Sequence, residues 1–143
     1  MPRMTEPEWR AFIMGGTRTG KIATVRADGR PHVVPIWFVL AGDEIIFTTG
    51  TDRAKAEHLR RDSRVALCVD DQAPLYSFVT IEGTVRMEDN PPDMLRWSTL
   101  IGARYMGAER ADEFGKRNAV PGELLVRMTI TRVIAERDVA GYD

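Results

Sequence analysis

Residues 48–62 read TTGTDRAKAEHLRRD, and the rest of the chain is organised around this stretch. It follows an apolar, strand-like run and continues in a helical pattern. Free N–H groups and the positive end of the dipole at a helix start attract an anion. Arg53 and Lys55 are unfavourable in a first turn that has no ligand, because first turns prefer Asp or Glu. A phosphate would neutralise both cations. The stretch therefore predicts a phosphate-binding corner; the alternative is a solvated helix start capped by Thr51 or Asp52.

Before this stretch, the pattern predicts three antiparallel strands joined by short turns, at residues 21–26, 31–40 and 44–49. The Asp-Gly pair at 28–29 is among the strongest hairpin signals. The second strand is apolar nearly throughout, so we expect both of its faces to be covered. Pro35 removes a ladder N–H within this strand, which indicates either a simple bulge or an opening that faces a planar ligand.

After the stretch, alternating patterns predict three more strands, at residues 64–70, 76–87 and 123–135. Gly83 in the long middle one indicates a bulge or bend, which a small closed barrel uses to turn a corner. Helical patterns lie at residues 4–14, 90–105 and 109–116. We therefore predict an α+β chain, a single domain over residues 1–143, in which six mostly antiparallel strands form a small barrel with peripheral helices.

Composition narrows the classes of function. The 143 residues carry a net charge of -1, which gives no electrostatic case for nucleic acid binding. Cys68 is the lone cysteine, so no intrachain disulfide is expected, and the two histidines are too few for a convincing metal cluster. The sequence has no apolar run near 18 residues and no signal-peptide pattern, so we expect a cytoplasmic protein that does not enter the membrane.

Three segments together carry a family resemblance: GKIATVRADGRPHVVPIWFVL at 20–40, IIFTTGTDRAKAEHLRRDSRVALCVDD at 45–71 and SFVTIEGTVRM at 77–87. In this order and spacing they resemble the pyridoxamine 5′-phosphate oxidase-like split β-barrel flavoproteins. More narrowly, they are similar to the actinobacterial branch that uses the deazaflavin coenzyme F420 in place of FMN. The resemblance implies a split β-barrel and a homodimer with two cofactor sites between the subunits.

The resemblance also implies which residues contact the cofactor. In this family the backbone of the second strand faces the ring, which carries over to Val34, Pro35, Ile36 and Trp37. The end of the third strand and the following helix hold the ribityl chain and phosphate, here Thr48, Thr49, Gly50, Thr51, Arg53 and Lys55. Candidates to reach the partner's site across the dimer are Tyr76 and Phe78, and Arg104 or Tyr105.

Three hypotheses of function follow. The first is a reductase in which bound F420 passes a hydride to an unsaturated small organic substrate, with no catalytic acid or metal identified from the sequence. The second is an FMN-dependent oxidoreductase on the same scaffold, and the third is a non-catalytic protein that binds F420 or FMN. The basic and tyrosine residues with which the oxidase binds its own substrate are not evident as a motif, which argues against pyridoxamine-phosphate oxidation.

Overall fold

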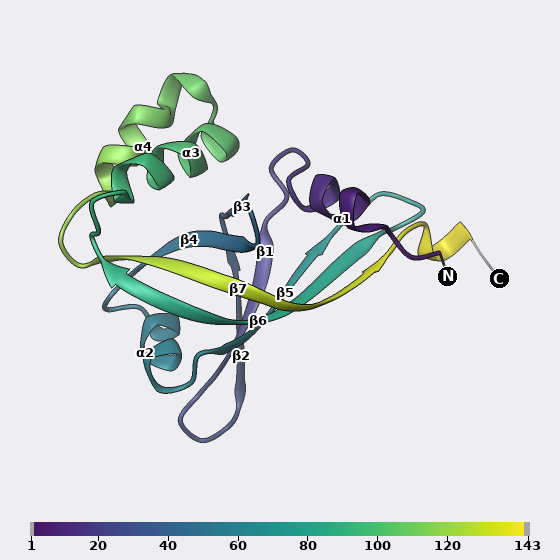
Figure 1. Ribbon diagram of the computed structural model, residues 1–143, viewed down its shortest axis with the longest axis horizontal. Coiled ribbons are helices and arrows are strands. Elements are labelled where there is room, and N and C mark those ends of the chain that lie inside the picture. Colours follow the sequence, from purple (N-terminus) through teal and green to yellow (C-terminus); the bar gives the residue numbers. More distant parts are fainter. Residues whose placement is uncertain (1, 142–143) are drawn as a thin grey trace.

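A computed structural model describes residues 2–141 of the chain (Figure 1). Its helices are α1 (Glu6–Ile13), α2 (Ala54–Arg61), α3 (Met94–Met106) and α4 (Ala111–Asn118), with 3-10 turns η1 (Ala108–Arg110) and η2 (Val139–Gly141). Its strands are β1 (Gly20–Val25), β2 (Pro31–Ile36), β3 (Val39–Ala41), β4 (Glu44–Gly50), β5 (Arg64–Asp70), β6 (Phe78–Asp89) and β7 (Glu123–Glu136). Helices α3 and α4 pack together at one end of the sheet, and α2 lies below it (Figure 1).

All strands join one antiparallel sheet in the order β2-β1-β5-β6-β7-β4-β3. The two edge strands, β2 and β3, are consecutive in the chain and are joined only by Trp37 and Phe38. The chain therefore passes directly from one edge of the sheet to the other, which curls the sheet into a split barrel. The α+β class and the antiparallel pairing are confirmed.

The predicted count of six strands is wrong, because residues 31–40 form two strands rather than one. Residues up to Ile36 pair with β1, whereas those from Val39 pair with β4 at the opposite edge. No single straight strand can serve both edges, so the ladder breaks where the barrel closes. The break lies just after Pro35, which itself remains within β2, opposite Lys21.

The predicted bulge at Gly83 is confirmed. The pairing of β6 with β7 shifts between Glu82, which faces Arg132, and Gly83, which faces Ile130. A side chain at Gly83 would place its Cβ 2.1 Å from the carbonyl oxygen of Thr129. Only glycine fits this close approach of two backbones, which bends the long strand over the barrel.

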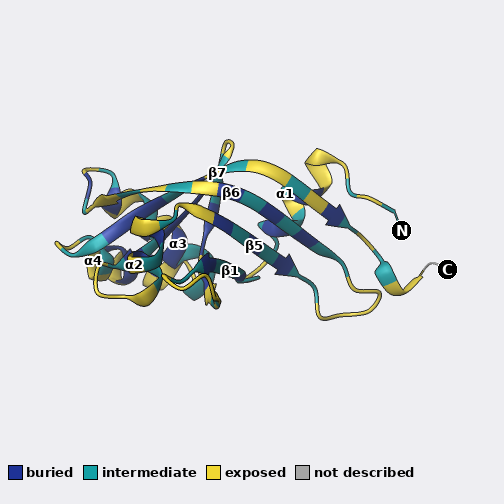
Figure 2. Ribbon diagram, turned by 90° about the horizontal axis from the view of Figure 1, so that it is seen from below, coloured by how far each residue is buried: buried dark blue, intermediate teal, exposed yellow. Residues whose placement is uncertain are grey.

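The main core fills the barrel interior between the strands and α1, and a smaller cluster of Val39, Ile46, Met94, Ile101 and Leu125 lies between α3 and the sheet. Buried residues alternate with less buried ones along β5 and β6 (Figure 2). The expectation that both faces of residues 31–40 are covered is wrong for a single chain. Pro31, Val33 and Pro35 all face outward and are exposed, with Val33 at 64%.

Candidate functional site

The corner between β4 and α2 brings the predicted phosphate-binding residues together. Strand β4 ends at Gly50, opposite Glu123, and the N–H of Thr51 donates to the carbonyl of Gly122 at 2.8 Å. The N–H of Arg53 donates to the carbonyl of Gly50 at 3.0 Å, so the chain turns sharply into the helix. Arg53 is the N-cap residue of α2, and no side chain caps this helix. The alternative of a cap by Thr51 or Asp52 is therefore not realised.

Two cations stand at this uncapped helix start. Arg53 is exposed and Lys55 is half-buried, and no carboxylate lies within 4.0 Å of either cationic group among residues 2–141. Burial lowers the pKa of Lys55, the charge of Arg53 lowers it further, and Glu123 opposes the shift. First-turn N–H groups have no intrahelical partners. The corner thus offers two cations and free N–H donors to an anion.

Two further features at this corner fit a polar ligand. Thr49 is only 4% exposed, and its Oγ1 has no hydrogen-bond partner in the described part of the chain. Beside it, Gly50 leaves a cradle. A Cβ there would lie 2.7 Å from Asp52 Oδ1, 3.4 Å from Glu123 Oε1 and 3.6 Å from Arg53 Cγ. The structure thus brings together the predicted set Thr48, Thr49, Gly50, Thr51, Arg53 and Lys55. Its two cations and the space above Gly50 suit a phosphate, whereas the neighbouring carboxylates of Asp52 and Glu123 oppose one.

The ring-facing candidates of β2 lie between α2 and the helical layer of α3 and α4. His32 at the start of the strand stacks edge-on against His58 of α2, with ring centroids 4.8 Å apart. Val34 and Ile36 face the barrel interior, whereas Pro35 faces outward. At the break that follows, Trp37 is 39% exposed and stacks on Tyr105 with 5.1 Å between ring centroids. An exposed aromatic face is therefore present at this end of the strand.

Tyr76 and Phe78 lie far from the corner of their own chain. Phe78 pairs with Glu136 at one end of β7, and Gly50 pairs with Glu123 at the other end. At roughly 3.3 Å per residue, the ends of β7 are about 40 Å apart. These aromatic residues and the two cations of the corner therefore cannot contact one small ligand within a single chain.

Arg104 and Tyr105 bind the backbone at the barrel's split within their own chain. Arg104 donates to the carbonyls of Ile13 and Phe38, both at 2.7 Å, and to that of Gly16 at 3.0 Å. The Tyr105 hydroxyl accepts from the N–H of Phe38 at 3.2 Å and donates to the carbonyl of Arg18, in the loop between α1 and β1, at 2.8 Å. The two residues connect α3, α1 and the β2–β3 junction, a role that the sequence analysis did not predict.

A buried polar contact ties α2 to the barrel below the corner. Thr24 Oγ1 lies 2.9 Å from His58 Nδ1, and Thr24 is almost completely buried. Burial lowers the pKa of His58, and the neighbouring His32 lowers it further. The C-terminal half of α2 is therefore anchored on β1, and Arg60 of the same helix donates to the carbonyl of Thr51 at 3.3 Å, which ties the helix to the corner as well.

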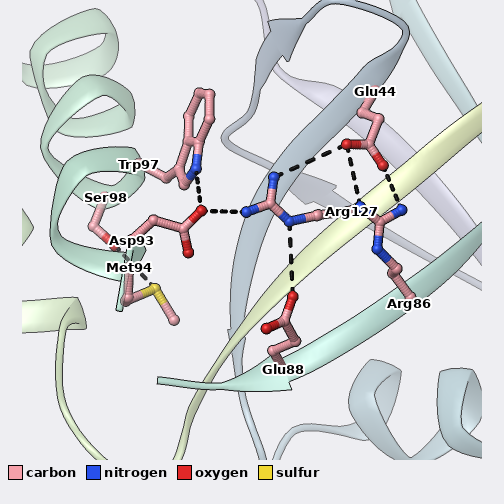
Figure 3. A network of polar contacts seen from close by, with 8 residues as sticks. All are labelled: Glu44, Arg86, Glu88, Asp93, Met94, Trp97, Ser98 and Arg127. Carbon is pink, nitrogen blue, oxygen red and sulfur yellow. Dashed lines mark hydrogen bonds and ion pairs between the residues drawn. The ribbon is translucent and has the colours of Figure 1, made fainter. Parts of the chain in front are cut away.

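A second polar network holds α3 on the barrel (Figure 3). Arg127 of β7, whose side chain is 14% exposed, pairs with Asp93, and Asp93 also accepts from Trp97 Nε1 at 3.0 Å. On the other side, Arg127 lies 3.9 Å from carboxylate oxygens of both Glu44 and Glu88. Burial raises the pKa of Asp93, but the hydrogen bond from Trp97 and the charge of Arg127 outweigh this effect and hold it below its usual range.

Residues 5–136 match the family described as Pyridoxamine 5′-phosphate oxidase. The chain belongs to this family. The match spans the barrel from the N-cap of α1 to the end of β7, so it includes the corner at Gly50 and the split at Phe38. Among residues 2–141, no helix is long and apolar enough to cross a membrane, and no group of His, Cys, Asp and Glu could hold a metal ion.

Solved structures share the fold of this family member. The conserved hypothetical protein Rv2991 from Mycobacterium tuberculosis is 28% identical, with a TM-score of 0.81 over 98% of this chain and 89% of that chain. A structure named F420 Reductase is 24% identical, with a TM-score of 0.68 over 93% and 98% of the two chains. HutZ, named as the heme storage protein from Vibrio cholerae, is 20% identical, with a TM-score of 0.71 over 91% and 94%. The last two likenesses show the fold alone.

Proposed function

We propose that this family member is an oxidoreductase that binds coenzyme F420 and reduces an unsaturated small organic substrate. The observation that carries the proposal is the pair Arg53 and Lys55, which stand at an uncapped helix start with no carboxylate within 4.0 Å in the described chain. The likeness to a structure named F420 Reductase supports the choice of the deazaflavin.

The chain's own residues would bind and orient the cofactor. Arg53, Lys55 and the first-turn N–H groups would hold the phosphate, with the Thr49 hydroxyl beside them. The backbone of β2 from Val34 to Trp37 would lie against the ring. When bound, F420 supplies the hydride, and the protein supplies position and exclusion of water.

We propose further that the functional form is a homodimer with sites between subunits. Tyr76 and Phe78 could join the corner only from a second chain, because β7 separates the two places within one chain. The exposed outer face of β2 also continues into a shallow depression of about 490 Å³ over β1, β5 and β6, lined by Ala23, Val25, Pro31 and Ala66 among others. Light scattering after size exclusion tests this; a monomer at micromolar concentration would refute it.

The decisive experiment titrates the purified protein with F420 and with FMN, following ligand fluorescence. Lys55→Ala and Arg53→Ala should each weaken F420 binding roughly 10- to 150-fold, because a charge-assisted hydrogen bond contributes about 1.5–3 kcal/mol. Lys116→Ala is the matched control, since Lys116 is exposed on α4 and its removal changes the net charge equally. Unchanged F420 affinity in both corner variants would refute the site.

The same titration separates the rival functions. Tighter binding of FMN than of F420 would favour an FMN-dependent oxidoreductase on this scaffold. Tight cofactor binding without turnover of any acceptor would instead favour a binding protein, a role compatible with the fold because HutZ is named a heme storage protein.

A further inference from the structure

Glu123 is an unexpected neighbour for a phosphate. It opens β7 opposite Gly50, and its backbone is fixed on both sides. Its N–H donates to the carbonyl of Val120 at 3.1 Å, and its carbonyl accepts from the N–H of Asn90 at 2.8 Å. The side chain reaches the cradle above Gly50, where its Oε1 is 3.4 Å from the position of an added Cβ. The carboxylate therefore lines the place that the proposed ligand would use.

No hydrogen bond or ion pair within 4.0 Å neutralises this carboxylate within residues 2–141. Burial raises the pKa of Glu123, the charge of Arg53 lowers it, and the adjacent Asp52 raises it again. Arg117 of α4 and Lys55 also act on it. Further charges lie at the same corner: Arg60 donates to the carbonyl of Thr51 and pairs with Glu57, and Asp89 accepts from the N–H of Gly122. Cations and carboxylates are therefore mixed around the cradle, and Glu123 is the carboxylate of β7 that lines it.

The two candidate cofactors differ in the charge of their phosphate. The phosphate of FMN is a monoester, which carries roughly -1.5 to -2 at pH 7 because its second pKa is about 6. The phosphate of F420 is a diester and carries a single negative charge. A carboxylate beside the phosphate repels the additional charge of the monoester more than it repels the diester.

We propose that Glu123 sets the charge of the phosphate that this corner accepts, favouring a singly charged phosphodiester over a doubly charged monoester. This inference rests on the proposed cofactor-binding function of the corner. Arg53 and Lys55 attract either phosphate, whereas the Glu123 carboxylate at the cradle repels each negative charge of the ligand, so a second negative charge costs more than the first.

The test uses two ligands with the same ring and ribityl chain, FMN and its phosphate monomethyl ester, in which one methyl group removes the second negative charge. Wild type should bind the methyl ester more tightly than FMN at pH 8. Glu123→Gln should strengthen FMN binding more than it strengthens ester binding. At a separation of about 6 Å, the affinity ratio should shift by about 3-fold with water-like screening and by about 100-fold with protein-like screening.

Glu109→Gln is the matched control, because it removes the same charge at an exposed position of η1, outside the corner. It should leave the ratio unchanged. An equal effect of Glu123→Gln on both ligands would overturn the inference, while weakened F420 binding in Lys55→Ala would still uphold the proposed function. Failure of wild type to bind F420 or either flavin would overturn both.

A measurement on wild type alone covers the case in which Glu123→Gln does not fold. Lowering the pH from about 8 to about 5 converts FMN to a monoanion but leaves the charge of its methyl ester unchanged. Both ligands meet the same charged groups of the protein, namely Asp52, Arg53, Lys55, Glu57, Arg60, Asp89, Arg117 and Glu123. FMN affinity should therefore rise relative to that of the ester, and a constant or falling ratio would overturn the inference.

Discussion

Replacing Arg104 by methionine should destabilise the chain more than any other single change of a charged side chain in α3. Its guanidinium donates to the carbonyls of Ile13, Gly16 and Phe38 at 2.7 to 3.0 Å. Those carbonyls belong to α1, to the loop after it and to the junction of β2 with β3. One side chain of α3 thus connects the end of α1 and the loop after it with the β2–β3 junction, two places that are distant in sequence from each other and from α3.

The magnitude follows from the bonds that are lost. A hydrogen bond from a charged donor contributes about 1.5–3 kcal/mol, and a buried acceptor left unpaired costs about 1–3 kcal/mol. Burial of the charge offsets part of this gain, since it lowers the pKa of Arg104. We expect Arg104→Met to lower the free energy of unfolding by about 3–6 kcal/mol, a large part of the 5–15 kcal/mol typical of a domain.

The assay is urea denaturation followed by far-UV circular dichroism and tryptophan fluorescence, with all variants at one protein concentration. Arg104→Lys should lose about half as much, because an ammonium cannot reach all three carbonyls together. Arg96→Met is the control: Arg96 is exposed on the same helix and only overlies Trp97, so its loss should be within about 0.5 kcal/mol.

A loss below about 1 kcal/mol in Arg104→Met would refute the reasoning. It would mean that the carbonyls at the split find water or other donors at little cost. A loss in Arg96→Met as large as that in Arg104→Met would also refute it, because the cause would then be helix charge rather than closure of the barrel.

Three further changes test other parts of the structure. Gly83→Ala should cost at least about 2 kcal/mol in urea denaturation, since its Cβ would meet the backbone oxygen of Thr129 at 2.1 Å. Thr49→Val should raise the free energy of unfolding by about 1–2 kcal/mol, seen as a higher melting temperature, because an unpartnered buried hydroxyl is replaced by a methyl group. Asp93→Asn should cost about 1–2 kcal/mol at pH 7, because Arg127 loses the nearest of its three carboxylate partners and keeps Glu44 and Glu88 at 3.9 Å. That cost should vanish as the pH falls through the lowered pKa of Asp93, where the wild-type carboxylate also becomes neutral.

Local sequence signals predicted most of the elements. The alternation at residues 64–70 gave β5 with both ends correct, and the lone glycine at position 83 gave the bulge. The expected strand 76–87 begins two residues later, at Phe78. Tyr76 has a positive φ of 64°, which is not an extended conformation, so it cannot belong to the strand. The split within residues 31–40 was not predictable, since it depends on which edge of the sheet each half joins.

The candidate site divides along the same line. Arg53 and Lys55 could be proposed as anion-binding residues from the sequence because the signal is local. Two cations stand at a helix start, where acidic residues are preferred. Glu123 could not be found, because it is 70 residues from Arg53 in the chain and reaches the corner only through the pairing of β4 with β7. The backbone contacts of Arg104 could not be predicted for a related reason: they depend on carbonyls of residues 13, 16 and 38, which only the fold brings to α3.

The corner at Gly50 brings several unsatisfied polar groups of the chain together. The start of α2 has no side-chain cap, as is also true of α3 and α4, the Thr49 hydroxyl has no partner in the described chain, and the carboxylates of Glu123 and Asp52 lie beside one another. Elsewhere Asp93, Arg104 and Arg127 have several polar partners each, although His32 Nδ1 on β2 is also buried without one in the described chain. Unpartnered polar groups lower the stability of the free protein, and they are expected at a site where a bound ligand supplies the missing partners.

Binding at the corner should therefore stabilise the fold measurably. A ligand at 100 times its Kd contributes about 2.7 kcal/mol, or a rise in melting temperature of roughly 8–14 °C for a chain of this size. F420 should produce this shift in wild type and a much smaller one in Lys55→Ala at the same concentration. An equal shift in both proteins would place the ligand somewhere other than the corner, and the unsatisfied groups there would then need another explanation.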